Sequence, residues 1–235
     1  MKVAQYILAF FCTFLSGAYA GVMPSQSRIV YRSDDKDASI MIANTNNYPV
    51  LVQTWVDKGE GSPDVQEVPF ISIPPVFYLE PAGVKGVRIF YNNAELSKEK
   101  ESLFWFNIYE IPPERKNMTP NNSVLVTMNT QIKLFYRPRG LDITPEEAIK
   151  KITCKVYDRE HISCFNPNPI HISVTGLQVL DSNGASAQAT NAEYMLNPFG
   201  KSLYHFKSTM TPFKVSIQYI DDLGNKLQHV LNITS

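Results

Sequence analysis

The residues with the most evident chemistry are two cysteines, Cys154 and Cys164. The stretch between them has apolar residues at both ends and charged residues in the middle, which is typical of a β-hairpin with its turn near Arg159. Residues opposite each other in such a hairpin come within disulfide reach, so we expect the two cysteines to be bonded. In the loop-entropy model such a closure stabilises a fold by about 3 kcal/mol. The four histidines show no ligand spacing, so we expect no metal site.

The sequence lacks the patterns of nucleophilic and phosphate chemistry. It has no Gly-x-Ser-x-Gly motif, no glycine-rich phosphate loop, and no histidine flanked by carboxylates and a nucleophile. The adjacent carboxylates at 146–147 and 221–222 read as the start of a helix and a tight turn. We therefore expect neither an enzyme nor a cofactor. The 22 basic and 22 acidic side chains balance, which argues against a nucleic-acid partner.

One apolar run, residues 123–138, is too long for an ordinary strand. Its first part places three apolar side chains on one face: Val124, Val126 and Met128. Such a strand is either buried in a core or available to a partner, because an edge without charged residues invites pairing. Leu125 breaks the alternation and Lys133 falls on the face opposite Met128, so we expect a bulge or a change of sheet within the run.

The elements that would position these residues are short strands. In the first part of the chain the strand signals are separated by turns rich in Asn, Gly and Pro, and residues 94–101 predict a helical turn. The predicted strands are 27–31, 38–43, 50–56, 76–79, 86–91, 103–110 and 123–136. This pattern is typical of an immunoglobulin-like sandwich.

A break at 138–140 separates this region from a second one. Residues 144–151 predict a short helix with Pro145 at its first position. Strand signals resume at 152–157, 162–165, 170–180, 192–196, 202–206, 215–220 and 227–233. We therefore predict an all-β protein of two sandwich domains, residues 21–138 and 139–235.

Residues 1–20 have the pattern of an export signal. Lys2 supplies a positive charge, residues 3–15 are largely apolar, and Ala18 and Ala20 are the small residues that a signal peptidase reads. The apolar stretch is short for a membrane span and no second one follows. We therefore expect an exported protein that begins at Gly21 and is not inserted in a membrane.

Two motifs resemble those of a known family. The segment Gln131–Pro138 is similar to the signature of the periplasmic chaperones of bacterial pilus assembly, the PapD-like family, and Phe104–Pro113 resembles the preceding strand of that family. Supporting matches are Ser27–Tyr31, Tyr48–Trp55, Pro74–Pro81 and Asn166–Pro169. Only the ten residues 114–123 separate Pro113 from Val124, which is similar to the short-loop subclass that serves rod-like pili and fimbriae.

The resemblance implies two immunoglobulin-like sandwiches set at an angle, the first of which lends a strand to an incomplete pilus subunit. Three residues match the donor positions: Val124, Val126 and Met128. Met128 departs from the branched aliphatic residue that is common there. The resemblance also implies a periplasmic location, an outer-membrane usher as a second partner, and self-association of the free chaperone through the exposed strand edge.

The resemblance assigns roles to charged residues as well. Arg28 and Lys133 match two cations that anchor the C-terminal carboxylate of the subunit. A further three residues match an interdomain ionic network: Glu101, Arg137 and Asp222. Cys154 departs from the family, because an aromatic residue is expected at its position.

Other protein classes stay open on the sequence alone. An exported adhesin or carbohydrate-binding protein would share the export signal and the strands, with Trp105 or Tyr109 as an aromatic platform beside Asn107 or Glu110. A secreted eukaryotic immunoglobulin-like domain would use the glycosylation patterns that begin at residues 117, 121 and 232. An exported hydrolase is weaker, because the sequence offers no nucleophile with a base.

Overall fold

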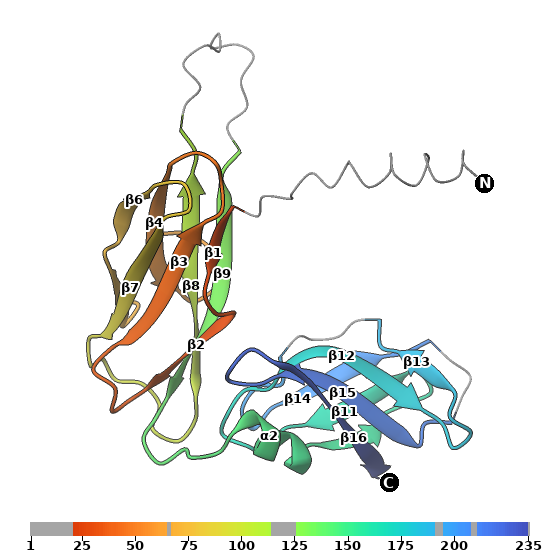
Figure 1. Cartoon of the computed structure of the whole chain (residues 1–235). Helices are drawn as coiled ribbons and strands as arrows, with labels where there is room; N and C mark the ends of the chain where they lie inside the picture. Colours follow the sequence, from red (N-terminus) through yellow and green to blue (C-terminus); the bar gives the residue numbers. More distant parts are fainter. Residues whose placement is uncertain (1–20, 65–66, 114–125, 191–194, 208–210, 235) are drawn as a thin grey trace, which may run out of the picture.

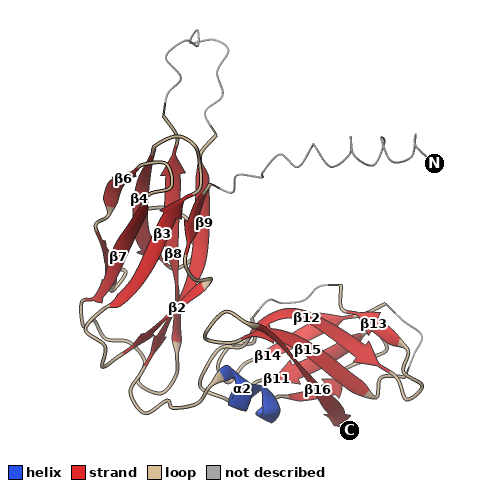
Figure 2. Cartoon of the chain, viewed as in Figure 1, coloured by secondary structure: helices blue, strands red, loops and turns tan. Residues whose placement is uncertain are grey.

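The structure is a computed structural model that describes residues 21–64, 67–113, 126–190, 195–207 and 211–234. Figures 1 and 2 show two sandwiches of strands set at an angle, with one short helix near their junction. The predicted all-β fold class with two immunoglobulin-like sandwiches is confirmed. The predicted leader, residues 1–20, lies outside the described residues. No helix of the described part has the length and apolar character needed to cross a membrane.

The first sandwich packs a four-stranded sheet on a five-stranded sheet. The order in the smaller sheet is β1 (Val22–Pro24), β3 (Ala38–Asn44), β7 (Val84–Tyr91) and β5 (Phe70–Ile73). The order in the larger sheet is β2 (Arg28–Arg32), β9 (Met128–Arg137), β8 (Ser102–Ile111), β4 (Val50–Asp57) and β6 (Val76–Leu79). Alternate residues of each strand build the core between the sheets.

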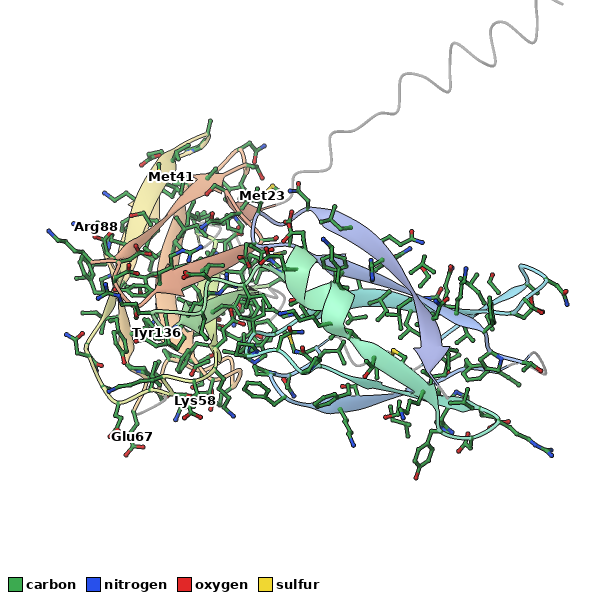
Figure 3. All side chains as sticks on the ribbon, turned by 90° about the horizontal axis from the view of Figure 1, so that it is seen from below. Met23, Met41, Lys58, Glu67, Arg88 and Tyr136 are labelled. Atoms are coloured by element: carbon green, nitrogen blue, oxygen red, sulfur yellow. A yellow bond between two sulfur atoms is a disulfide. The ribbon has the colours of Figure 1, made fainter. Side chains whose placement is uncertain are left out.

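The strand β3 illustrates the alternation. Ile40 and Ile42 are buried in the core, whereas Ser39 and Met41 are exposed. Figure 3 shows Met41 and Arg88 on the outer side of the first sandwich, away from the second domain. The smaller sheet therefore has one buried and one solvated face, as expected for an antiparallel sheet.

The second sandwich is formed by a seven-stranded sheet. Its order is β13 (Ser186–Gln188), β12 (Ser173–Leu180), β15 (Lys214–Ile220), β16 (Lys226–Thr234), β10 (Thr153–Val156), β11 (His161–Phe165) and β14 (Lys201–His205). Helix α2 (Pro145–Ala148) and a 3-10 turn at Ile149–Lys151 precede it. The predicted helix with Pro145 first is thus confirmed, and Thr144 and Glu147 cap it reciprocally.

The predicted disulfide is also confirmed. Cys154 of β10 lies opposite Cys164 of β11 in the predicted hairpin, and the two are bonded. Both residues are fully buried and belong to the core of the second sandwich. Cys154 therefore contributes to packing at the position where an aromatic residue was expected.

Several sequence predictions need correction. The helical turn expected at 94–101 is wrong, because these residues form an irregular link whose end, Glu101, is drawn toward the second domain. No bulge or change of sheet interrupts β9, which pairs with β8 in unbroken register from Met128 to Tyr136, whereas Leu125 lies outside the described residues. Three short edge strands, β1, β5 and β13, were not predicted from the sequence. Most of the strand expected at 192–196 lies outside the described residues, and Leu196, which is described, forms a bridge with Ile172.

Candidate functional site

The two predicted anchor cations lie side by side. Strand β2 pairs parallel with β9, and the first pair in this register is Arg28 with Lys133. The guanidinium of Arg28 is buried, and its Nη1 donates to the Ile220 carbonyl at 3.2 Å and to Ser173 Oγ at 3.3 Å. Lys133 Nζ donates to the same Ser173 Oγ at 3.5 Å. We call Arg28 and Lys133 the cation pair.

The electrostatics of the cation pair favour an anion. Burial lowers the pKa of Arg28, although the carboxylates of Asp222, Asp221 and Glu101 oppose the shift. Burial, followed by the positive charge of Arg28, lowers the pKa of Lys133 to about 8. The ion pairs between described residues use other cations, and Arg28 Nε is buried without a hydrogen-bond partner among them. The lowered pKa values mean that the charged forms of both side chains are disfavoured in the free protein. A carboxylate that accepts hydrogen bonds from both cations would stabilise their charged forms.

A second charged group joins the two domains. Arg137 Nη2 donates to Glu101 Oε1 at 2.9 Å, and its Nη1 donates to Asp222 Oδ2 at 2.6 Å. The side chain of Arg137 is 3% exposed and that of Glu101 is 1% exposed, so this is a buried network rather than a solvated pair. Burial by itself lowers the pKa of Arg137, but Asp222 and Glu101 outweigh it and hold the pKa above its ordinary value.

The network includes a member that the sequence did not reveal. His171 donates from its backbone N–H to Glu101 Oε2 at 2.8 Å, and its ring nitrogen Nδ1 lies 2.8 Å from the same oxygen. The ring also packs on Phe135 of β9, with centroids 5.6 Å apart. Phe135 and Glu101 of the first sandwich are therefore both held by one residue of the second.

Strand β9 is flanked on both sides over only part of its length. β8 pairs with residues 128–136, whereas β2 pairs with residues 133–137. No described strand covers the β2 side of residues 126–132. We call residues 126–132 the open segment and residues 133–137 the closed segment. Val126 and Met128 of the open segment are 74% and 51% exposed, and Val124 lies outside the described residues.

The amide and carboxylate groups that a carbohydrate site would need already form hydrogen bonds within the protein. Asn107 is fully buried, and its Oδ1 accepts from Asn129 Nδ2 at 2.9 Å and from Gln131 Nε2 at 2.8 Å. Glu110 is also buried, where it accepts from the Val22 N–H at 2.9 Å. The aromatic platform expected for a carbohydrate-binding protein therefore lacks free polar groups among its predicted partners.

The hydrogen-bond partners that the second domain supplies to the cation pair were not predicted from the sequence. Ser173 and the Ile220 carbonyl lie on β12 and β15, 145 and 192 residues away from Arg28 in the sequence. Their residue types carry no signal, because a buried serine and a backbone carbonyl occur in any sandwich. Asp222, two residues after Ile220, was the only pointer to this part of the second domain.

Both sandwiches match models of one protein family. Residues 21–142 match the family model described as the PapD N-terminal domain of pili and flagellar-assembly chaperones, and residues 147–231 match the PapD C-terminal domain of pili assembly chaperones. The chaperone protein FimB/FhaD of Bordetella pertussis is 30% identical over 95% of this chain and 93% of its own length. The chaperone protein PapD of Escherichia coli is 32% identical over 90% of this chain and 86% of its own length.

A solved structure supports the fold assignment. The crystal structure of the YadV chaperone, a probable fimbrial chaperone of Escherichia coli, has a TM-score of 0.77 and 28% sequence identity to this chain. The similarity covers 90% of this chain and 99% of that structure. The likeness therefore extends across both sandwiches.

Proposed function

The chain belongs to the PapD family of pilus assembly chaperones, and we propose that it binds pilus or fimbrial subunits through the cation pair and the open segment. We call such a subunit the client. The observation that carries the proposal is a pair of adjacent cations, the buried Arg28 and the half-buried Lys133, at the end of the open segment. The cation pair would hold the C-terminal carboxylate of the client, and the open segment would pair with its last strand.

The register of β2 predicts the direction of the client strand. β2 occupies one edge of β9 from Lys133 onward and runs parallel to it. A client strand on the same edge must lie along residues 126–132 and reach the cation pair with its C terminus. It therefore runs toward Lys133, which is parallel to β9 itself. This arrangement places the client strand and β2 end to end along one edge.

The open segment would also supply core side chains to the client. Met128 and Val126 have the same strand parity as Ile132 and Leu134, which are buried in the core of the first sandwich. The client would thus continue this core past its present end, with Val124 as a third donated side chain. Burying two such side chains contributes about 1.5 to 3 kcal/mol each before ordering costs.

The remaining features of the family are part of the same proposal. We expect cleavage of the leader after residue 20, action in the periplasm, and delivery of the client to an outer-membrane usher. Residues 21–138 and 139–235 would be the two domains. Free copies would pair through the open segment, because an unpaired strand edge without charged residues promotes such pairing.

Recovery of clients from the periplasm tests the proposal. We expect Lys133→Ala and Arg28→Ala to fold with nearly wild-type thermal stability and to lose the subunits that co-purify with the wild-type protein, identified by mass spectrometry. Lys85→Ala is the matched control, because Lys85 is an exposed lysine of β7 in the other sheet. Subunit recovery by Lys133→Ala at the level of Lys85→Ala would refute the anchoring role.

A further inference from the structure

Two hairpin turns of the second domain share one hydrogen-bond geometry. They are residues 181–185, which join β12 to β13, and residues 221–225, which join β15 to β16. In each turn the N–H of the leading aspartate donates to the carbonyl of the fifth residue, and the N–H of the fourth residue, a glycine, donates to the aspartate carbonyl. In each, the aspartate carboxylate also accepts from the N–H of the fifth residue. The aspartate and the glycine therefore account for both turns.

The second and third residues distinguish the two turns. In turn 181–185, at the end of the second domain far from the first (Figure 1), they are the exposed polar residues Ser182 and Asn183. In turn 221–225 they are Asp222, which pairs with Arg137, and Leu223. Leu223 is 84% exposed, more than any other large apolar side chain in the described part of the chain. Because the same geometry forms with Asn183, the turn itself does not require a leucine.

Three contacts fix turn 221–225 beside the cation pair. The Ile220 carbonyl, directly before the turn, accepts from Arg28 Nη1 at 3.2 Å. Asp222 Oδ2 lies 2.6 Å from Arg137 Nη1. Gly224 lies against Ser27, since a Cβ at Gly224 would be 2.7 Å from Ser27 Oγ. Figure 1 shows this turn reaching toward β2. Leu223 is thus held at the rim of the cation pair by contacts that leave its own side chain in water.

We propose that Leu223 is a specificity-determining contact that receives an apolar side chain within the last few residues of the client. The inference rests on the proposed function, because the client strand reaches this turn only if its carboxylate is held at Arg28 and Lys133. An apolar client side chain here would remove Leu223 from water, whereas a polar one would gain nothing. The second domain would then recognise a side chain near the C terminus of the client, and the first domain would recognise the terminal carboxylate.

Peptide binding to the full-length mature protein tests the inference. The probes are fluorescent synthetic peptides of alternating Thr and Val with a free C-terminal carboxylate and either Leu or Ser next to the last residue. The variant is Leu223→Asn, which installs the residue type that stands in the matching position of turn 181–185. Lys133→Ala and an amidated peptide report on the cation pair, and Asn183→Leu is the matched surface control.

We expect Leu223→Asn to melt like the wild type and to bind the Leu peptide about tenfold more weakly, with the Ser peptide unchanged. Equal affinity of Leu223→Asn and wild type for the Leu peptide would overturn the inference, and so would an equal loss for both peptides, which would indicate a structural role. In both of these cases a loss of binding by Lys133→Ala would leave the proposed function intact. If the wild type prefers neither carboxylate peptide over its amidated form, the proposed function fails and the inference fails with it.

Discussion

The closed segment and all of the open segment from Met128 onward lie in one strand, β9, and share one neighbour, β8, yet they have different surroundings. In the closed segment β2 covers the second edge, and Leu134 and Phe135 are buried on opposite faces. In the open segment no described strand covers that edge, and Val126 and Met128 are exposed although their residue types suit a core. The difference shows that the apolar pattern of a strand predicts which side chains need burial, but not which molecule buries them.

We expect the largest effects from a glutamate placed on each segment in turn. Leu134→Glu buries an unpaired charge in the protein's own core, and we expect the first domain to unfold. Val126→Glu leaves the charge hydrated in the free protein, so we expect a cooperatively folded protein that forms no client complex. Thermal melts and co-purification measure the two effects. Loss of the first domain's transition in Val126→Glu would show that Val126 is a residue of the protein's own core.

The buried network at the end of the closed segment predicts the next largest effect. We expect Arg137→Ala to destabilise the protein by about 3 kcal/mol or more in urea unfolding, because Glu101 would be left buried without its cation. Arg88→Ala is the matched control, since Arg88 pairs with Asp37 at an exposed site. We expect this control to melt nearly as the wild type does. An equal effect of the two substitutions would contradict the assignment of Arg137 to a network that holds the domains together.

Loss of the disulfide should affect neither the open segment nor the closed segment of β9. Reduction of the bond between Cys154 and Cys164 should lower the stability of the second domain by about 3 kcal/mol, because the bond lies within one hairpin of that domain. The expected result is a second-domain transition that moves to lower temperature while the first-domain transition stays in place. Scanning calorimetry with and without reductant measures both transitions, and a shift confined to the first domain would contradict this account.

The cation pair predicts a smaller, pH-dependent effect. Lys133 has a pKa of about 8 in the free protein, and a bound carboxylate would favour its charged form and raise that pKa. Binding then takes up a proton above pH 8, so affinity should fall as the pH rises through this range, by at most about tenfold per pH unit. Peptide titrations from pH 6 to pH 10 measure the slope. Lys133→Arg keeps its charge and should show a flat profile, and a flat wild-type profile would exclude Lys133 from the anchor.

How well the sequence predicts a feature of this protein depends on how far apart in the chain the interacting residues lie. The hairpin disulfide and the capped helix were predictable because both rest on neighbouring residues. The cation pair, Arg28 and Lys133, was indicated by family resemblance, since nothing local distinguishes these residues from surface cations. Ser173 and His171 were missed because their roles come from packing between the domains. The bulge or change of sheet expected within residues 123–138 is wrong for β9, because Lys133 lies on the face opposite Met128 through ordinary strand alternation.

Amide hydrogen exchange along β9, measured by NMR in the free protein and in the client complex, tests the central claim most directly. In the free protein we expect rapid exchange of those amides of residues 127–132 that face the uncovered edge, and slow exchange throughout residues 133–137. In the complex the same open-segment amides should become protected while the closed segment changes little. Protection of the open segment in the free monomer, or no gain of protection on client binding, would contradict the claim that this segment is lent to a partner.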